Sequence, residues 1–195
     1  MIRKSTVIAA ALALCALAGC STPKARFYAL SAPGQPASKA LYSVAVGPVS
    51  VPEAVDRPQL VLRNAGNEVT IAEQTRWAGP LKSEVPRVLA ANLAQALGDA
   101  YVSAYPQSTV SGADYVVVVD IQRFESAPGE AATIEALWAV RAAKGKDGAP
   151  RNGRSVVREP AQGKDDDALV AAHSRALMSI SRDIAEAVRA ARATR

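Results

Sequence analysis

Cys20 is the residue whose place in the sequence points most directly to chemistry. It follows two basic residues near the start of the chain, an apolar segment over residues 7–18 and the small residues Ala18 and Gly19. The apolar segment holds about a dozen residues, whereas a helix needs about 20 to cross a bilayer. A basic start, a short apolar segment and small residues at its end are typical of a secretory signal that is removed.

The four residues Leu17-Ala18-Gly19-Cys20 resemble the bacterial lipobox. This resemblance implies cleavage before Cys20, a lipid on its sulfur, residues 1–19 as the signal peptide and residues 20–26 as a lipidated tether. Ser21, in place of aspartate, resembles lipoproteins sorted to the outer membrane, so we expect the protein to face the periplasm there, with acylated Cys20 binding membrane lipid. The alternative is an ordinary signal peptide, or a core helix that happens to contain a cysteine.

The other side chains with reactive chemistry are few and isolated. Cys15 would leave with the signal peptide, so the mature chain would have no disulfide. His173 is the only histidine, and its place on the apolar stripe of a predicted helix favours a packed side chain over a catalytic one. The sequence lacks the Gly-x-Ser-x-Gly pattern of hydrolases. Asp165–Asp167 lack the alternating ligands of a calcium loop, which favours a helix start. We therefore predict no enzyme activity, no metal and no cofactor.

The length and net charge of the chain indicate how many domains it has and which partners it can bind. Without residues 1–19 the formal net charge falls from +5 to +3, because Arg3 and Lys4 leave with that segment. This charge is too mild and too mixed with acidic residues to indicate nucleic acid as a partner. The remaining length fits one domain that buries about two thirds of its unfolded surface, and we place this domain at residues 27–195.

Most of the predicted elements that would position these residues are strands. Residues 27–30 have strand composition, and residues 115–124 begin with four valines that are apolar on both faces, which is typical of a central strand. Turn residues at 64–67 indicate a hairpin. The sheet would have six or seven strands, drawn from residues 27–30, 42–51, 59–63, 68–72, 101–105, 115–124, 133–142 and 155–158.

Two amphipathic helices complete the prediction. The first spans Leu81–Leu97 and is closed by Gly98; a cap at Ser83 would put Pro86 in the first turn, where no hydrogen bond is lost. The second starts at Asp165–Asp167 and buries a stripe of Leu169, His173, Leu177, Ile180, Ile184 and Val188. The helices would cover the same face of the sheet or opposite faces, which gives a single-domain α/β fold with a mixed sheet. Residues 31–40 and 144–154 are expected to be loops, the second one mobile.

Several motifs, in order along the chain, resemble the ABC-type transport auxiliary lipoproteins of the PqiC kind. They are Arg26–Leu30, Val44–Val49 with Pro52, Asp56–Val61 with Arg63, Arg76–Ala78 with Pro80-Leu81, and Ala185 after Ile184. The resemblance implies a non-enzymatic accessory that docks an intermembrane lipid-transport system at the outer membrane. Its partners would be an MCE-domain protein and the associated inner-membrane ABC or Pqi-type transporter. The loop at residues 144–154 is longer than in the family pattern.

Two motifs are candidates for partner binding. Asp56, Arg57 and Gln59 would form a partner-facing loop, or else a turn whose arginine pairs with a carboxylate and fixes the strand that follows. Arg76 and Trp77 would anchor an interface, or Trp77 would belong to the core. The basic residues of 144–158 would meet anionic lipid or remain solvated. Assembly into a homo-oligomer is possible, and the alternative function is a structural or assembly lipoprotein that scaffolds an outer-membrane complex without handling lipid.

Overall fold

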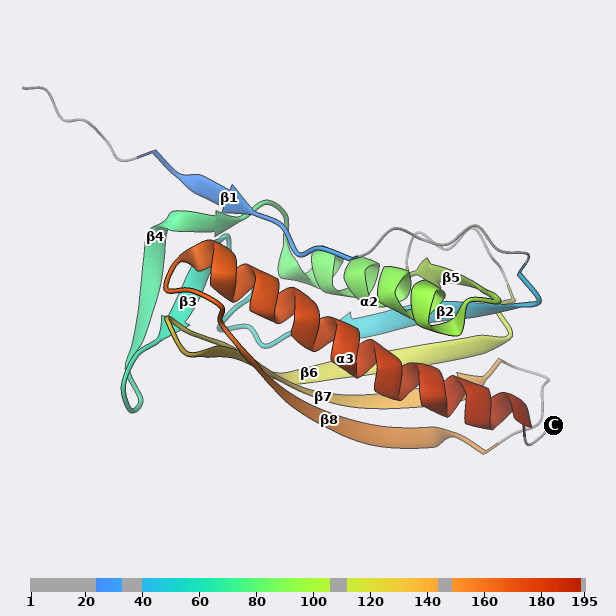
Figure 1. The fold of residues 1–195 in the computed structure, drawn as a ribbon. Coiled ribbons are helices and arrows are strands. Elements are labelled where there is room, and N and C mark those ends of the chain that lie inside the picture. Colours follow the sequence, from blue (N-terminus) through green and yellow to red (C-terminus); the bar gives the residue numbers. More distant parts are fainter. Residues whose placement is uncertain (1–23, 33–39, 106–111, 144–148, 194–195) are drawn as a thin grey trace, which may run out of the picture.

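One long strand runs through the middle of a mixed sheet that carries two helices on one face (Figure 1). The computed structural model describes residues 24–32, 40–105, 112–143 and 149–193. The predicted signal peptide, Cys20, most of the tether and parts of the loops predicted at residues 31–40 and 144–154 lie outside these ranges. The elements are β1 (Arg26–Tyr28), β2 (Tyr42–Ser50), β3 (Gln59–Arg63), β4 (Val69–Trp77), α2 (Leu81–Leu97), β5 (Ala100–Ala104), β6 (Tyr115–Ala127), β7 (Ala131–Ala142), β8 (Arg151–Pro160) and α3 (Asp166–Ala193).

Strand β6 organises the sheet because it pairs along both edges. One edge pairs antiparallel with β7 from Tyr115 to Ala127, and β7 pairs antiparallel with β8. The other edge is divided between two groups of strands. The parallel strands β2 and β5 follow its first half, and β3 meets its second half at Ser126, with β4 and then β1 beyond. The predicted central place of residues 115–124 is confirmed.

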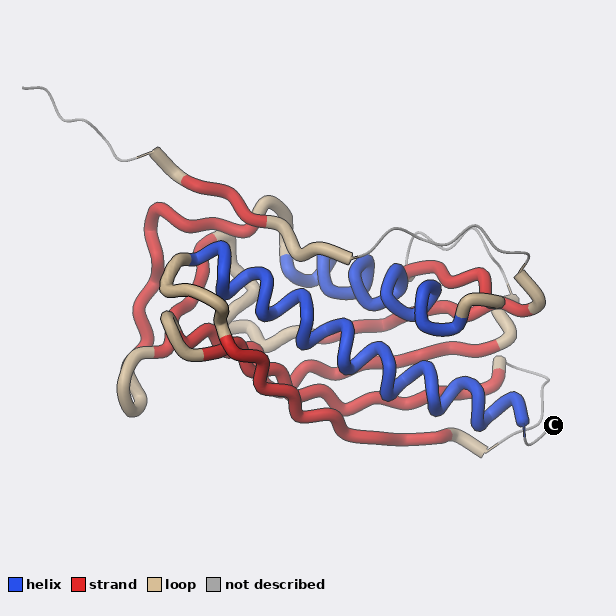
Figure 2. Tube along the Cα trace, viewed as in Figure 1, coloured by secondary structure: helices blue, strands red, loops and turns tan. Residues whose placement is uncertain are grey.

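The single-domain α/β fold with two amphipathic helices is confirmed, and the question of which face they cover is settled. Helices α2 and α3 lie side by side on the same face of the sheet (Figures 1 and 2). Helix α2 packs mainly on β2 and β5, and α3 mainly on β7 and β8. Their apolar stripes share one buried cluster with Val117, Val119 and Ile121 of β6, which are at most 2% exposed. On the opposite face, Val116 and Val118 are only half-buried, so the valine run is not covered equally on both faces.

The number of strands and several boundaries differ from the sequence prediction. The sheet has eight strands rather than six or seven, because every segment with strand character pairs, including the short Arg26–Tyr28. Strand β4 extends to Trp77 instead of ending at residue 72, and β8 begins at Arg151, inside the predicted loop. The residues of both extensions are mostly polar, so the sequence shows no alternation of apolar and polar residues there, although exposure does alternate in the folded strands.

The first helix spans the predicted residues, but its cap was predicted wrongly. Helix α2 begins at Leu81, directly after Pro80, so Ser83 lies inside the helix and Pro86 lies beyond the first turn. The predicted start of the second helix at Asp165–Asp167 is confirmed. The Asp165 carboxylate accepts a hydrogen bond from the Ala168 N–H at 2.8 Å and caps α3.

His173 is completely buried in a small aromatic cluster. Its ring stacks on Phe124 with 4.0 Å between the ring centroids and 2° between the planes, and Trp77 meets both rings edge-on. Its Nε2 lies 2.8 Å from the Ser126 hydroxyl oxygen. Burial lowers the pKa of His173 from its ordinary value of 6.5 to about 3, so the imidazole is neutral in the folded protein. His173 therefore packs in the core, as the sequence favoured.

The buried imidazole predicts a pH-dependent stability. Below pH 6.5 the unfolded chain binds a proton at His173 that the folded chain does not bind until about pH 3. This group should therefore lower the free energy of unfolding by about 1.4 kcal/mol per pH unit as the pH drops from 6.5 to about 3, and its contribution is fully retained above pH 6.5. Urea unfolding of the wild type and of His173→Phe would measure this. The variant keeps the stacked ring and should lose most of this slope; equal slopes would contradict the prediction.

Candidate functional site

The fold brings together the two motifs that the sequence singled out. Strand β3 starts at Gln59 and pairs antiparallel with β4, so Gln59 faces Arg76 across the ladder. The Trp77 N–H donates a hydrogen bond to the Pro58 carbonyl oxygen at 2.7 Å. The loop that contains Asp56 and Arg57 therefore lies against the end of β4, although the hairpin separates the two motifs along the chain.

A surface hollow of about 510 Å³ opens between these segments. Its walls are the loop before β3, the turn from β4 to α2 and the first turn of α2. Three of the five predicted partner-binding residues, Asp56, Arg57 and Trp77, line the hollow, whereas Gln59 and Arg76 form the adjoining ladder. The remaining lining residues are Pro58, Ala78, Gly79, Pro80 and Lys82.

Of the three charged side chains that line the hollow, two form an ion pair and the third faces solvent. The Asp56 carboxylate, 14% exposed, forms an ion pair with Lys82, and this hydrogen bond and charge raise the pKa of the Lys82 ammonium. Arg57 is exposed, and no side-chain hydrogen bond or ion pair involves it in the part of the chain that the structure describes. The prediction that Arg57 pairs with a carboxylate is therefore wrong within these residues. The carboxylate of Asp56 is held by Lys82, which leaves the guanidinium of Arg57 open to solvent.

Trp77 contributes to both the hollow and the core. Its side chain is 5% exposed and its ring lies 6.0 Å from Phe124 and 6.2 Å from His173, measured between centroids. The structure thus agrees with the core interpretation of Trp77. Because part of this residue also lines the hollow, the floor of the hollow is backed by the rigid aromatic cluster.

The first strand after the predicted tether joins the same end of the sheet. Strand β1 runs parallel to the end of β4, with Phe27 opposite Arg76 and Tyr28 opposite Trp77. The Tyr28 carbonyl oxygen accepts a hydrogen bond from the Ala78 N–H at 2.7 Å. The predicted tether therefore leads to β1, which lies beside the end of β4 (Figure 1), and Trp77 at that end lines the hollow.

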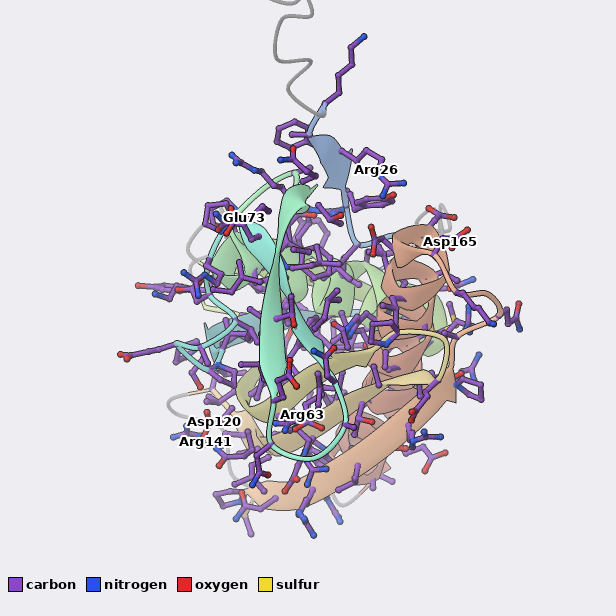
Figure 3. The ribbon with its side chains drawn as sticks, turned by 90° about the vertical axis from the view of Figure 1, so that its left-hand side faces the viewer. Arg26, Arg63, Glu73, Asp120, Arg141 and Asp165 are labelled. Atoms are coloured by element: carbon purple, nitrogen blue, oxygen red, sulfur yellow. The ribbon has the colours of Figure 1, made fainter. Side chains whose placement is uncertain are left out.

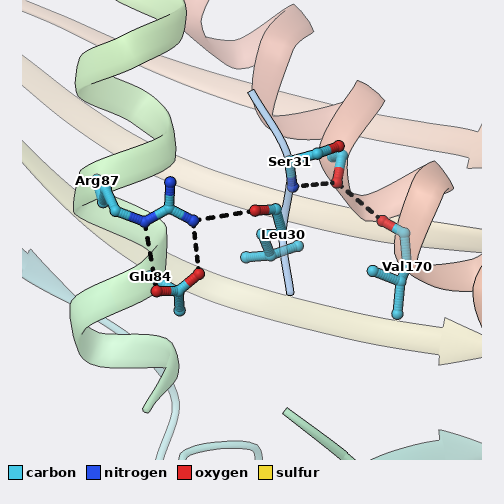
Figure 4. Close-up of polar contacts among 6 residues, drawn as sticks. Leu30, Ser31, Glu84, Arg87 and Val170 are labelled. Carbon is cyan, nitrogen blue, oxygen red and sulfur yellow. Dashed lines mark hydrogen bonds and ion pairs between the residues drawn. The ribbon is translucent and has the colours of Figure 1, made fainter. Parts of the chain in front are cut away.

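The chain after β1 is held between the two helices (Figure 4). Leu30 is 2% exposed, and its carbonyl oxygen accepts a hydrogen bond from Arg87 of α2 at 3.0 Å. The Ser31 N–H donates to the Ser174 hydroxyl of α3 at 3.1 Å. Arg87 is itself oriented by Glu84 at 2.6 Å. These contacts attach the first described segment to both helices as well as to the sheet.

Sequence reasoning missed Lys82 as a member of this site. The helix was expected to be capped at Ser83, so Lys82 was not placed in its first turn. Pro80 followed by Leu81 was the available indication, because proline is favoured at helix N-termini and cannot continue a preceding strand ladder. Lys82 then lies on the first turn of α2, where it reaches across to Asp56.

Among the described residues, no three His, Cys, Asp or Glu side chains lie close enough together to bind a metal ion. The acidic residues at the start of α3 have structural contacts instead. Asp165 caps the helix, and Asp166 accepts hydrogen bonds from Thr75 at 2.7 Å and from Arg26 at 3.2 Å. None of the helices in the described ranges is long and apolar enough to cross a membrane.

Comparison with known proteins gives a family and a fold. No curated protein matches the sequence. A crystal structure of an uncharacterized protein superimposes with a TM-score of 0.70 and 19% identity, covering 85% of this chain and 99% of that one. Protein XCC0632 from Xanthomonas campestris, described as a DUF330 protein, gives a TM-score of 0.62 and 20% identity, covering 83% and 93%.

A family model agrees with this likeness and covers most of the chain. The model described as the ABC-type transport auxiliary lipoprotein component matches residues 28–185, from β1 into α3. The matched range includes the hollow, both motifs and the aromatic cluster. The chain therefore belongs to the ABC-type transport auxiliary lipoprotein component family.

Proposed function

We propose that this protein is a non-enzymatic accessory of an MCE-type intermembrane lipid-transport system, held at the outer membrane by acylated Cys20. In this role it would face the periplasm and dock an MCE-domain protein, and through it the inner-membrane ABC or Pqi-type transporter. The observation that carries the proposal is the hollow formed by the two motifs beside β1. Family membership supports the transport role.

The position of the hollow relative to Cys20 suits a docking point at a membrane. Arg26, at the start of β1, is the sixth residue after Cys20, and an extended chain of that length reaches at most about 20 Å. Strand β1 is paired with β4 and cannot move independently of the hollow. A partner bound in the hollow would therefore be held close to the membrane that receives or supplies the lipid.

Keeping this gap short has a physical advantage for lipid transfer. Each methylene of an acyl chain exposed to water costs about 0.8 kcal/mol. A lipid that leaves a shielded conduit far from the membrane would expose many methylenes at once. A docking protein fixed to the membrane brings the mouth of the conduit to the bilayer and shortens the exposed step.

The chemistry of the hollow suits one anchoring side chain of a protein partner. Arg57 and Pro58 are exposed at its rim, the Lys82 side chain is 64% exposed, and Trp77 backs its floor. Interfaces concentrate their binding free energy in a few anchors that fill preformed pockets, and arginine and tryptophan are enriched there. The net positive rim favours a partner with an acidic residue at the centre of its contact surface.

Removing the acylated thiol tests the anchor. The variant Cys20→Ala should lose its lipid and be released from the outer membrane or mislocalised, because the two or three acyl chains that would bury their methylenes in the bilayer are then absent. Membrane fractionation with immunoblotting measures the distribution. Retention of the variant in the outer-membrane fraction would show that the anchor is elsewhere.

Reversing the free charge at the rim tests the docking surface. Arg57→Glu should reduce co-purification of the MCE-domain partner about tenfold, the effect of losing a 1.4 kcal/mol contact, without lowering the melting temperature, because Arg57 has no described partner to lose. Arg141→Glu is the matched control, since it makes the same charge change at an exposed β7 position far from Arg26 (Figure 3).

Asp56→Ala separates the docking interpretation from a structural one. It leaves Lys82 without its carboxylate and should lower the melting temperature slightly, as expected for a partly exposed pair. If Arg57→Glu leaves partner recovery unchanged while Asp56→Ala only destabilises the fold, the loop is structural and the docking surface lies elsewhere.

A further inference from the structure

A basic and aromatic surface lies at the first described residues of the chain. Lys24 and Arg26 are exposed, and Phe27 is 65% exposed. The residues that follow turn inward, since Tyr28 packs against the core and Leu30 is 2% exposed. The ring of Phe27 thus faces away from the core, whereas Tyr28 and Leu30, which follow it in the chain, pack into the core.

This surface is rigidly held and is not a loose end of the chain. Arg26 forms an ion pair with Asp166 at 3.2 Å, and the same carboxylate oxygen accepts a hydrogen bond from Thr75 at 2.7 Å. The pairing of β1 with β4 and the contacts of Leu30 and Ser31 with the helices fix the backbone on both sides (Figure 4). The exposure of Phe27 is therefore imposed by the fold.

The length of chain before this surface limits what can cover it. Lys24 lies four residues after Cys20 and Phe27 lies seven after it, which are spans of at most about 14 Å and 25 Å. If Cys20 is acylated, its lipid is in the bilayer and these side chains cannot leave the neighbourhood of the head groups. A membrane surface is thus the one occupant that is always within reach.

The chemistry of the residues matches that occupant. Aromatic rings are enriched at the boundary between head groups and acyl chains, and each lysine or arginine near an anionic membrane surface contributes about 1 kcal/mol of attraction. Arg26 keeps 63% of its side chain exposed despite its ion pair, and Arg76 lies opposite Phe27 in the ladder. A single exposed apolar residue is ordinary on a protein surface, but here a ring flanked by cations lies only seven residues after the predicted lipidation site.

We propose that Lys24, Arg26 and Phe27 form a second, non-covalent membrane contact, in which Phe27 inserts at the bilayer interface and the two cations meet anionic phospholipid head groups. This inference rests on the proposed anchoring of Cys20. It adds that the protein does not swing on its tether: a covalent anchor and a rigid contact fix the orientation of the domain. The hollow beside β1 is then held at a constant height above the membrane, with β8 on the side of the sheet away from β1 (Figure 1).

Site-directed labelling of the acylated, full mature protein tests this contact. The variant Phe27→Cys would carry an environment-sensitive fluorophore, with Val156→Cys as the matched control, because Val156 is also an exposed apolar strand residue, 52% exposed, on β8. Both are reconstituted on vesicles of phosphatidylethanolamine and phosphatidylglycerol. Quenching by aqueous iodide should be about threefold weaker at position 27 than at position 156, since interfacial side chains lie about 5–10 Å into the boundary.

Charge dependence is the second measurement. Adding Lys24→Glu to the labelled Phe27→Cys protein, or replacing the anionic lipid by phosphatidylcholine, should raise iodide quenching at position 27 toward the value at position 156. Melting temperatures equal to the wild type establish that the variants are folded. Vesicle-bound protein with equal quenching at both positions overturns the membrane contact alone. Protein that does not remain on the vesicles overturns the anchor as well, and protection at position 27 that requires an added MCE-domain protein assigns the surface to that partner instead.

Discussion

The structure depends on how strand β6 shares its edges. One edge is fully used by β7, whereas the other is divided between β2 and β3. The pairing with β2 is irregular between Val46 and Val49 and ends at Asp120, so the last part of β6 is free to receive β3 at Ser126. This division places the β3–β4–β1 group at one end of the sheet, and with it both motifs that border the hollow.

A consequence of this arrangement is that β1, the hollow and the core are connected by continuous pairing and packing. Strand β1 pairs with β4, whose last residue is Trp77, and Trp77 packs on the stack of Phe124 and His173. Phe124 belongs to β6 and His173 to α3. A force applied at the start of β1 would therefore be carried into the central strand and the long helix, which suits the proposed anchored role.

The ionic contacts around the hollow show how tertiary position decides the role of a charge. Asp56 and Arg57 are neighbours in the sequence, but the turn directs the carboxylate toward α2, where Lys82 pairs with it. Arg57 is left at the rim. A salt bridge with Arg57 would have made the whole motif structural, whereas the pairing with Lys82 keeps one cation available to a partner. At the start of β1, Asp166 similarly orients Arg26 without burying it.

The sequence by itself determined the features that have local causes. The apolar period defined both helices, Asp165 capped the second, the turn at residues 64–67 joined a hairpin, and the valine run predicted the central strand, because capping and periodicity act over a few residues. Only the tertiary structure decided that both helices share one face, that Arg26–Tyr28 pairs with β4, and that Pro58 meets Trp77. These outcomes depend on pairings between residues far apart in the chain, and no pattern within a single segment encodes them.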